Sequence, residues 1–381
     1  MTRRVLLSEV SSRDALPLRA LVGTRCVPIE ADPDPGAAMC VVHGGSVDSL
    51  LAFGRTHPQV ARVLLCGAGD GLATMGRGGV AHEVLVRPFS PATVRATLAR
   101  AGEVHSLLRD PELSRLMDSL GALPALPATY QALCRVVADP TSSIGDVADV
   151  VGRDVAVSSR VLAVVNSGLY SLPRKVNSVE QAVGLLGLTT VRDLVLAVEV
   201  FHALGERETS LDDLQKAAHA RGSLARVLAP RHLSDAAYTS GLLCELGRMV
   251  LVARMADRYG EVDAAVGEGL DRAQVERRVF DVSSRELGAR MLALWGLPGD
   301  IVSTVLDPAS GAPIADLVRL AELFVQEAVH EKACDESLVL VTRGMLAPWG
   351  LERRADLARR LARTMVGSGL EPPARAGHSA A

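Results

Sequence analysis

Cysteine is the residue type in this chain whose spacing tests most directly for chemistry. The six cysteines stand at positions 26, 40, 66, 134, 244 and 334. A cysteine zinc site usually contains pairs a few residues apart, and a disulfide framework belongs to small secreted domains. These cysteines lie far apart and form no CxxC pair. The spacing predicts neither kind of site, and it favours a reducing, cytoplasmic compartment.

Glycine offers a second candidate site. The segment ARVLLCGAGDG, residues 61–71, resembles the first loop of nucleotide-binding and S-adenosylmethionine-binding folds. Such a site also needs a full crossover helix and an acid at the end of the next strand, which binds the ribose. Here the following LATMGRGG is short and interrupted by glycine, and the next predicted strand, EVLV, ends at Arg87-Pro88. A methyltransferase-like domain is therefore kept only as an alternative.

The elements around this loop indicate an α/β domain over the first hundred residues. Short apolar runs without alternation, separated by helix-length gaps, are typical of buried strands in a parallel sheet. These runs are Val5 to Leu7, Met39 to Val42, Val63 to Cys66 and Glu83 to Val86. From Pro91 the apolar spacing becomes helical, which predicts a helical connector interrupted near Pro111.

The rest of the chain reads as helices to about Met365. Ser143 with Asp146, and Ser178 with Gln181, have the spacing of capping boxes at helix starts. Gly187 stands where the second of these helices could end. The tail, residues 367–381, is rich in Gly, Pro, Ala and Ser, and we expect it to be disordered.

Composition narrows the class of protein. The 381 residues allow two or three domains, and 48% hydrophobic residues are ordinary for a globular protein. A formal net charge of −3 gives no sign of the basic face of a nucleic-acid binder. Near the N-terminus the apolar run is only VLL, and no run approaches membrane-spanning length. We expect a soluble protein with no membrane segment and no nucleic-acid partner.

Several short elements between Leu123 and Leu196 occur together in one order. They are Leu123-Pro124, Leu126-Pro127, Asp139-Pro140, Asp154, Asn166-Ser167, Tyr170, Val176, Ser178, Ala182 and Leu186-Gly187. With them the region resembles the HDOD domain, an all-helical relative of the HD phosphohydrolases found in bacterial signalling proteins. The resemblance covers roughly Leu123 to Gln326 and implies an all-α fold. Each element also has a structural explanation; Asn166 and Ser167, for example, are expected to end a helix.

The resemblance lets the catalytic positions be checked one by one. An HD phosphohydrolase needs a first histidine, an adjacent His-Asp pair and further His or Asp ligands around one or two metals. No His-Asp dipeptide occurs in this chain. GLLCELGRMVL, residues 241–251, is similar to the helix "LLHDIGKLVL" and places Cys244 and Glu245 where His and Asp would stand. Gly222 falls at the first histidine, with His219 one helical turn earlier, and Ser284 falls at a later one.

These departures predict a helical scaffold without catalytic residues, metal or cofactor. Cysteine, carboxylate and histidine can ligate zinc, so a rearranged site at Cys244, Glu245 and His219 is the alternative. The segment from Ser283 to Val302 matches the family's later helix and its WGLP turn. We expect this turn, Trp295 to Pro298, to be structural.

The first domain resembles a response-regulator receiver, a flavodoxin-like fold. The marker is EVLVRPFSPATVRATLARA, residues 83–101, which looks like the last strand, the Lys-Pro turn and the final helix of that fold. Ser8-Glu9 keeps one carboxylate of an acidic pair, and His43 stands where the acceptor aspartate would be. Cys66 replaces the switch hydroxyl and Arg87 the lysine. The resemblance implies a pseudo-receiver that works without phosphorylation.

Together these expectations divide the chain into five parts: a pseudo-receiver domain (1–104), a helical connector (105–121), an HDOD domain (122–330), C-terminal helices (331–366) and the tail (367–381). The predicted function is a non-catalytic bacterial signalling protein that binds other signalling proteins, with homo-oligomerisation left open. A change at one domain would shift the connector and alter the surface of the other. The alternatives are a residual metal-dependent phosphohydrolase and a regulator that binds a nucleotide such as cyclic di-GMP without turnover.

Overall fold

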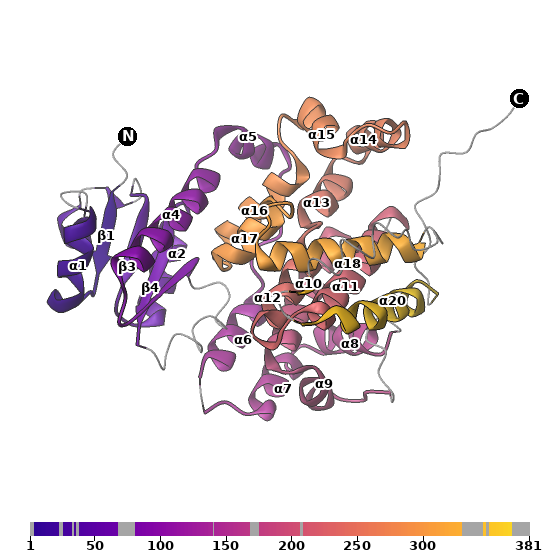
Figure 1. Ribbon diagram of the computed structural model, residues 1–381, viewed down its shortest axis with the longest axis horizontal. Coiled ribbons are helices and arrows are strands. Elements are labelled where there is room, and N and C mark those ends of the chain that lie inside the picture. Colours follow the sequence, from indigo (N-terminus) through magenta and orange to yellow (C-terminus); the bar gives the residue numbers. More distant parts are fainter. Residues whose placement is uncertain are drawn as a thin grey trace, which may run out of the picture.

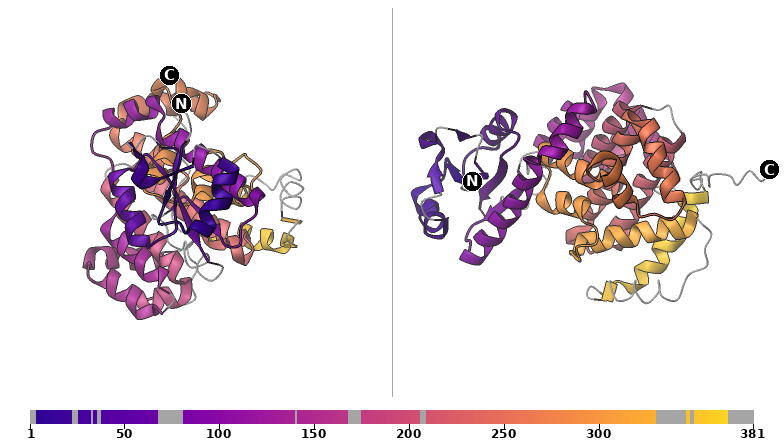
Figure 2. Two further views of the ribbon diagram at one scale, coloured as in Figure 1. Left: turned by 90° about the vertical axis from the view of Figure 1, so that its left-hand side faces the viewer. Right: turned by 90° about the horizontal axis from the view of Figure 1, so that it is seen from above.

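The computed structural model describes residues 4–22, 26–32, 34–35, 38–67, 81–139, 141–167, 175–205, 209–329, 346–347 and 350–367. A small α/β unit occupies one end of the molecule and a larger all-helical region the other (Figure 1). A single long helix at the junction runs beside both (Figure 2). Tyr170, the glycine-rich loop after residue 67 and most of the tail lie outside the described residues.

The α/β unit contains five parallel strands in the order β2-β1-β3-β4-β5. Their bounds are β1 Val5–Ser8, β2 Cys26–Pro28, β3 Cys40–His43, β4 Ala61–Cys66 and β5 Glu83–Val86. All four predicted runs are strands. The sequence did not predict β2, because it has only three residues and ends in proline, a poor strand residue. The apolar runs are unalternated because helices cover both faces of the sheet.

Each face of the sheet has its own helices. Helices α1 (Ser12–Val22) and α4 (Pro91–Leu108) pack on one face, where Leu18 and Val94 join the inward side chains of the strands. Helix α2 (Val47–Thr56) covers the other face through Leu50. The short 3-10 helix η2 (Ile29–Ala31) follows β2. The five parallel strands therefore end at one edge, where the predicted receiver residues should meet.

The residues predicted to form a connector are helical, with the break near Pro111 where it was expected. Helix α4 runs without a break through residue 104 to Leu108, and α5 (Pro111–Ser119) starts at an Asp110 cap with proline in its first turn. Leu108, Leu116 and Leu120 are buried in the main core. Both helices pack against α16 (Ser284–Leu294), so they are part of the helical region's surface and not a free linker.

The remaining helices form the larger region. They are α6 Ala128–Ala138, α7 Ile144–Gly152, α8 Val155–Val165, α9 Val179–Leu186, α10 Leu188–Leu204, α11 Thr209–Leu228, η5 Arg231–Leu233, α12 Ser234–Leu243, α13 Leu246–Arg254, α14 Ala256–Gly267, α15 Arg272–Phe280, α16, α17 Gly299–Leu306, α18 Pro313–Val329 and α20 Glu352–Gly367. Every residue of α10 from Thr190 to Val198 is buried, so this helix lies at the centre. Helices α6 to α9 pack as a lobe on one side of it.

The helices begin and end close to the residues at which the sequence predicts their ends. Ser143 and Asp146 form the expected capping box of α7. Ser178 caps α9, but the Gln181 side chain accepts from the amide of Asn177 and not from that of Ser178. Gly187 ends α9 with φ 89°, a left-handed conformation that favours glycine. Asn166 ends α8 and ties it to Val176 by two hydrogen bonds, which confirms its structural role.

One stretch among the described residues is long and apolar enough to cross a membrane by composition alone. It runs from Arg231 to Arg254 and comprises η5, α12 and α13. The chain turns between α12 and α13, and 72% of the apolar window is buried inside the helical region. This stretch is therefore a core element of the helical region.

Candidate functional site

Close helix crossings surround the turn between α12 and α13. At Gly222 of α11, a Cβ atom would lie 3.0 Å from the Tyr238 carbonyl oxygen and 3.3 Å from the Leu242 Cβ atom. At Gly241 of α12, it would lie 3.0 Å from the Gly222 Cα atom. Glycine at both positions lets the two backbones touch. The backbone of α12 therefore takes the space that a histidine side chain would need at position 222.

Helices α13 and α16 make a second crossing of the same kind. A Cβ atom at Gly247 would overlap the Ser284 carbonyl oxygen and lie 2.6 Å from the Gly288 amide nitrogen. Distances this short do not occur for real Cβ atoms, so glycine is required here. The crossing fixes Ser284 beside the turn that carries Cys244 and Glu245.

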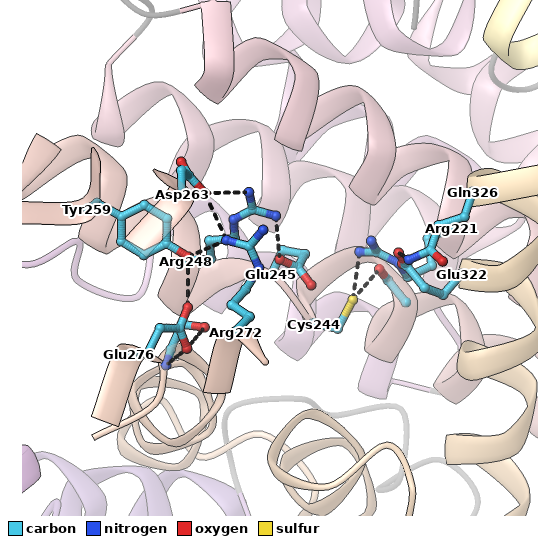
Figure 3. A network of polar contacts seen from close by, with 12 residues as sticks. Arg221, Cys244, Glu245, Arg248, Tyr259, Asp263, Arg272, Glu276, Glu322 and Gln326 are labelled. Carbon is cyan, nitrogen blue, oxygen red and sulfur yellow. Dashed lines mark hydrogen bonds and ion pairs between the residues drawn. The ribbon is translucent and has the colours of Figure 1, made fainter. Parts of the chain in front are cut away.

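Cys244 lies in that turn and is held by an arginine. Arg221 of α11 donates from Nη1 to the Cys244 Sγ atom over 2.9 Å, and the thiol contacts the Gly241 carbonyl at 3.2 Å. The Nε atom of Arg221 pairs with the Glu322 carboxylate of α18. Gln326 donates to the other Glu322 oxygen at 2.8 Å. Figure 3 shows these four side chains converging.

The charges in this group follow from burial and pairing. Burial raises the pKa of the Cys244 thiol to about 11, although the Arg221 guanidinium acts in the opposite direction. Burial alone would also raise the pKa of Glu322, but Arg221 and Gln326 together hold it below its usual range. The thiol is therefore neutral at physiological pH, and the formal charges are those of an Arg–Glu pair.

Glu245 belongs to a second, more open group beside the first (Figure 3). Its carboxylate is 3.7 Å from Arg248 Nη1, and Arg248 Nη2 is 3.5 Å from Asp263. Arg272 pairs with the same Asp263 oxygen at 2.9 Å. Arginine side chains thus neutralise the carboxylates of Glu245 and Asp263.

The second group ends at Ser284. Arg272 donates to the Tyr259 hydroxyl at 3.2 Å, and that hydroxyl donates to Glu276 Oε1 at 2.7 Å. Ser284 donates both its amide and its hydroxyl to Glu276 Oε2, each at 2.8 Å. Burial raises the pKa of the Tyr259 phenol, which keeps it a donor. A continuous set of polar contacts therefore links Glu245 to Ser284.

His219 takes no part in these contacts. It is 5% exposed, its ring lies edge-on to Phe201 at 5.7 Å between centroids, and its Nδ1 atom has no hydrogen-bond partner. Burial lowers its pKa to about 4, so the imidazole is neutral at physiological pH. In the described parts of the chain, no group of three or more His, Cys, Asp or Glu side chains is placed to hold a metal ion.

The comparisons with known proteins concern this helical region. Residues 123–308 match the HDOD domain family. This part of the chain is an HDOD domain. The match ends within the range 122–330 that the sequence indicated.

Solved structures show the same fold. A proposed phosphohydrolase from Shewanella amazonensis SB2B superposes with a TM-score of 0.55, at 22% identity over 68% of this chain and 98% of that one. An HDOD domain protein from Geobacter sulfurreducens gives a TM-score of 0.53 at 23% identity, over 68% and 93% of the two chains. An uncharacterized protein from Treponema pallidum (strain Nichols) is 23% identical over 197 residues. That alignment covers 50% of this chain but 38% of the relative's length.

The HDOD fold brings together three of the five residues that the resemblance picked out. Cys244, Glu245 and Ser284 lie around the α12–α13 turn, Gly222 contributes a helix crossing and no side chain, and His219 packs apart from them. The sequence did not point to Arg221, Glu276 or Glu322. Arg221 and Glu322 are 101 positions apart, and no motif signals their pairing.

The residues predicted for a receiver site meet at the carboxyl edge of the sheet, as parallel strands require. His43 at the end of β3 is 2% exposed. Its Nδ1 atom is 3.1 Å from the Ser8 hydroxyl, and its Nε2 atom is 2.8 Å from the Ser46 carbonyl and 2.9 Å from the Ser49 hydroxyl. Because a carbonyl only accepts, Nε2 carries the proton, and His43 ties β1 to the start of α2.

The other residues predicted for a receiver site, Arg87, Glu9 and Cys66, also make contacts at this edge. Arg87 pairs with Asp14 of α1 at 2.9 Å and lowers the pKa of that carboxyl. Glu9 is exposed, has φ 52°, and its side chain lies over Gly45. Cys66 is buried at the end of β4, where its carbonyl accepts from the Arg87 amide at 2.9 Å. These contacts hold the loops of the edge together.

Proposed function

We propose that the protein is a non-catalytic signalling protein in which a receiver-like N-terminal domain and the HDOD domain act by binding other proteins. The observation that carries the proposal is the contact between Arg221 and Cys244. Where an HD phosphohydrolase would hold a metal, this chain has a neutral thiol and a guanidinium paired with Glu322. Side chains that satisfy one another in this way leave little chemistry for a phosphate ester.

The N-terminal domain supports the same proposal. The strand order β2-β1-β3-β4-β5 is the order of flavodoxin-like folds, which include the receivers. A working receiver clusters carboxylates to hold magnesium beside an aspartate. Here the corresponding edge has His43 in hydrogen bonds to Ser8 and Ser46, and Arg87 is paired with Asp14. We therefore propose a domain that signals by binding and not by phosphorylation.

The decisive experiment is an affinity pull-down from cell extract with identification by mass spectrometry. Single substitutions Val155→Lys, Leu185→Lys and Leu16→Lys provide matched baits, because these side chains are 76%, 57% and 68% exposed and lysine at each position should leave the fold intact. We expect specific signalling proteins on the wild-type bait and their loss on one of the variants. Background proteins alone on every bait would contradict the proposal.

Three assays on the purified protein separate the alternatives. Metal analysis and hydrolysis of a model phosphodiester test the phosphohydrolase: we expect no stoichiometric metal and no activity. Metal-dependent activity that disappears in Glu245→Ala would replace the proposal with an enzyme. Thermal unfolding with and without cyclic di-GMP tests the nucleotide regulator, because a ligand of the folded state raises the melting temperature. We expect no shift with the nucleotide, and none after treatment with a chelator.

A further inference from the structure

His82 joins the two parts of the molecule from a position just before β5. It is 2% exposed and sits between the sheet and the α16–α17 turn. Its Nδ1 atom accepts from the Arg62 amide of β4 at 2.9 Å, and its Nε2 atom is 2.7 Å from the Ala293 carbonyl of α16. The Arg62 amide can only donate, so Nε2 carries the proton and donates to Ala293. The His82 side chain, with its proton on Nε2, therefore makes hydrogen bonds to both parts of the molecule.

The backbone of His82 makes a second bond across the junction. The Gly299 amide donates to the His82 carbonyl over 2.6 Å. Gly299 is the first residue of α17, and Pro298 before it provides no side-chain cap. The first amides of a helix have no partner within that helix. His82 therefore caps the start of α17 with its carbonyl, while its side chain bonds a carbonyl at the end of α16.

Surrounding groups keep this contact close and His82 neutral. A Cβ atom at Gly299 would lie 2.5 Å from Glu83 Oε1 and 3.3 Å from the His82 carbonyl oxygen, so glycine permits the approach. Glu83 is paired with Arg100 of α4 at 2.7 Å. Burial lowers the pKa of His82 to about 3; Arg62 adds to this, and the bond to Ala293 opposes it. At physiological pH the imidazole thus has the single proton that the geometry requires.

Strand β5 connects this contact to the opposite edge of the sheet. It begins at Glu83, directly after His82, and ends at Val86, directly before Arg87, which pairs with Asp14. It is the last strand in the order and pairs with β4 along one side only. An edge strand has hydrogen-bond partners on one side only, so fewer bonds oppose its displacement than oppose that of a central strand. The span from residue 82 to residue 87 is about 17 Å at strand rise.

We propose that His82 is a latch between the N-terminal sheet and the α16–α17 turn, and that β5 couples the Arg87–Asp14 pair to this latch. A partner or ligand that breaks the Arg87–Asp14 pair would then loosen the start of α17 in the HDOD domain. This coupling is independent of whether the HDOD domain binds another protein. It gives the two domains a physical route of communication through one short strand.

Hydrogen–deuterium exchange of the full chain tests the latch. His82→Ala should raise exchange of the α17 N-terminal amides about tenfold, and His82→Gln, whose amide can still donate to Ala293, should raise it less. Gly299→Ala opens the same contact from the HDOD side, because its Cβ atom would press on the Glu83 carboxylate and the His82 carbonyl. It should raise exchange at the start of β5 in the other domain. Unchanged exchange at α17 in His82→Ala, or at β5 in Gly299→Ala, would overturn the latch.

The coupling needs a readout that simple loss of stability does not give. Arg87→Gln removes the pair with Asp14, and Arg4→Gln removes a comparable pair with Asp32 (2.9 Å) in the same domain but away from β5. We expect exchange at the start of α17 to rise about threefold or more in Arg87→Gln and to stay at the wild-type level in Arg4→Gln. Equal effects of the two variants, or no effect of Arg87→Gln, would refute the coupling.

Discussion

Arg221 and Cys244 are in direct contact beside the α12–α13 turn of the HDOD domain: the Nη1 atom donates to the Sγ atom over 2.9 Å. The arginine comes from α11 and the cysteine from the α12–α13 turn, and Glu322 of α18 holds the other side of the guanidinium. A buried cation thus joins three helices by polar contacts. Cys244, which stands where the family resemblance implies a lost metal ligand, therefore helps to hold these helices together.

Replacing Arg221 with methionine should destabilise the protein by on the order of 3 kcal/mol. Methionine fills a similar volume, but it leaves the Glu322 carboxylate without its partner and the Cys244 thiol without a donor. Chemical denaturation monitored by circular dichroism measures the loss. The double variant with Glu322→Gln should recover part of it, because the unpaired charge is then removed. A double variant no more stable than Arg221→Met alone would contradict this account.

Gly247→Ala should be severely destabilising, by more than the roughly 1–3 kcal/mol of ordinary overpacking. Its Cβ atom would overlap the Ser284 carbonyl, and backbone at a helix crossing has no room to yield. Gly260→Ala in α14 is the matched control, because nothing lies within 4 Å of that Cβ atom. The control should gain about 0.5–1 kcal/mol from helix propensity. Similar melting temperatures for the two variants would show that the α13–α16 crossing is loose.

Local features of this fold could be predicted from the sequence, and long-range polar contacts could not. The Ser143 capping box, the end of α9 at Gly187 and the break before α5 depend on residues a few positions apart, and all three were predicted. The family resemblance placed Cys244 on a helix, whereas the structure has it in the turn between α12 and α13. Its contact with Arg221 was not predicted, because two residues 23 positions apart on different helices carry no periodic signal.

The carboxyl edge of the N-terminal sheet shows the same difference between local features and long-range contacts. The parallel order of the strands guarantees that the residues after β1, β3, β4 and β5 gather at one edge. Whether they form a site depends on where their side chains bond. Arg87 pairs with Asp14. Asp14 does not follow a strand, so the pattern of strand ends does not predict it. His82 was missed for a related reason: a histidine before a strand has no signature until the partner helix is in place.

Tyr259→Phe should cost about 1.5 kcal/mol of stability. The variant loses the hydroxyl that donates to Glu276 at 2.7 Å, and Glu276 is buried with few other donors. Ser284→Ala removes a second donor to the same carboxyl, although the Ser284 amide still bonds it. The two losses should not be additive, since both donors serve one acceptor group. Denaturation of both single variants and the double variant measures the coupling, and strictly additive losses would exclude a shared network.

His219→Leu should make stability less sensitive to acid. Burial lowers the pKa of folded His219 to about 4, whereas an unfolded histidine titrates near 6.5. Between these values the unfolded state binds a proton that the folded state excludes, so stability falls as the pH falls. From pH 7 to pH 5 the wild type should therefore lose about 2 kcal/mol more than the variant. At pH 8 the His219 imidazole is neutral in both the folded and the unfolded state. The stability at pH 8 is therefore the reference for each protein. Parallel stability curves from pH 8 to pH 5 would mean that His219 is not buried as a neutral side chain.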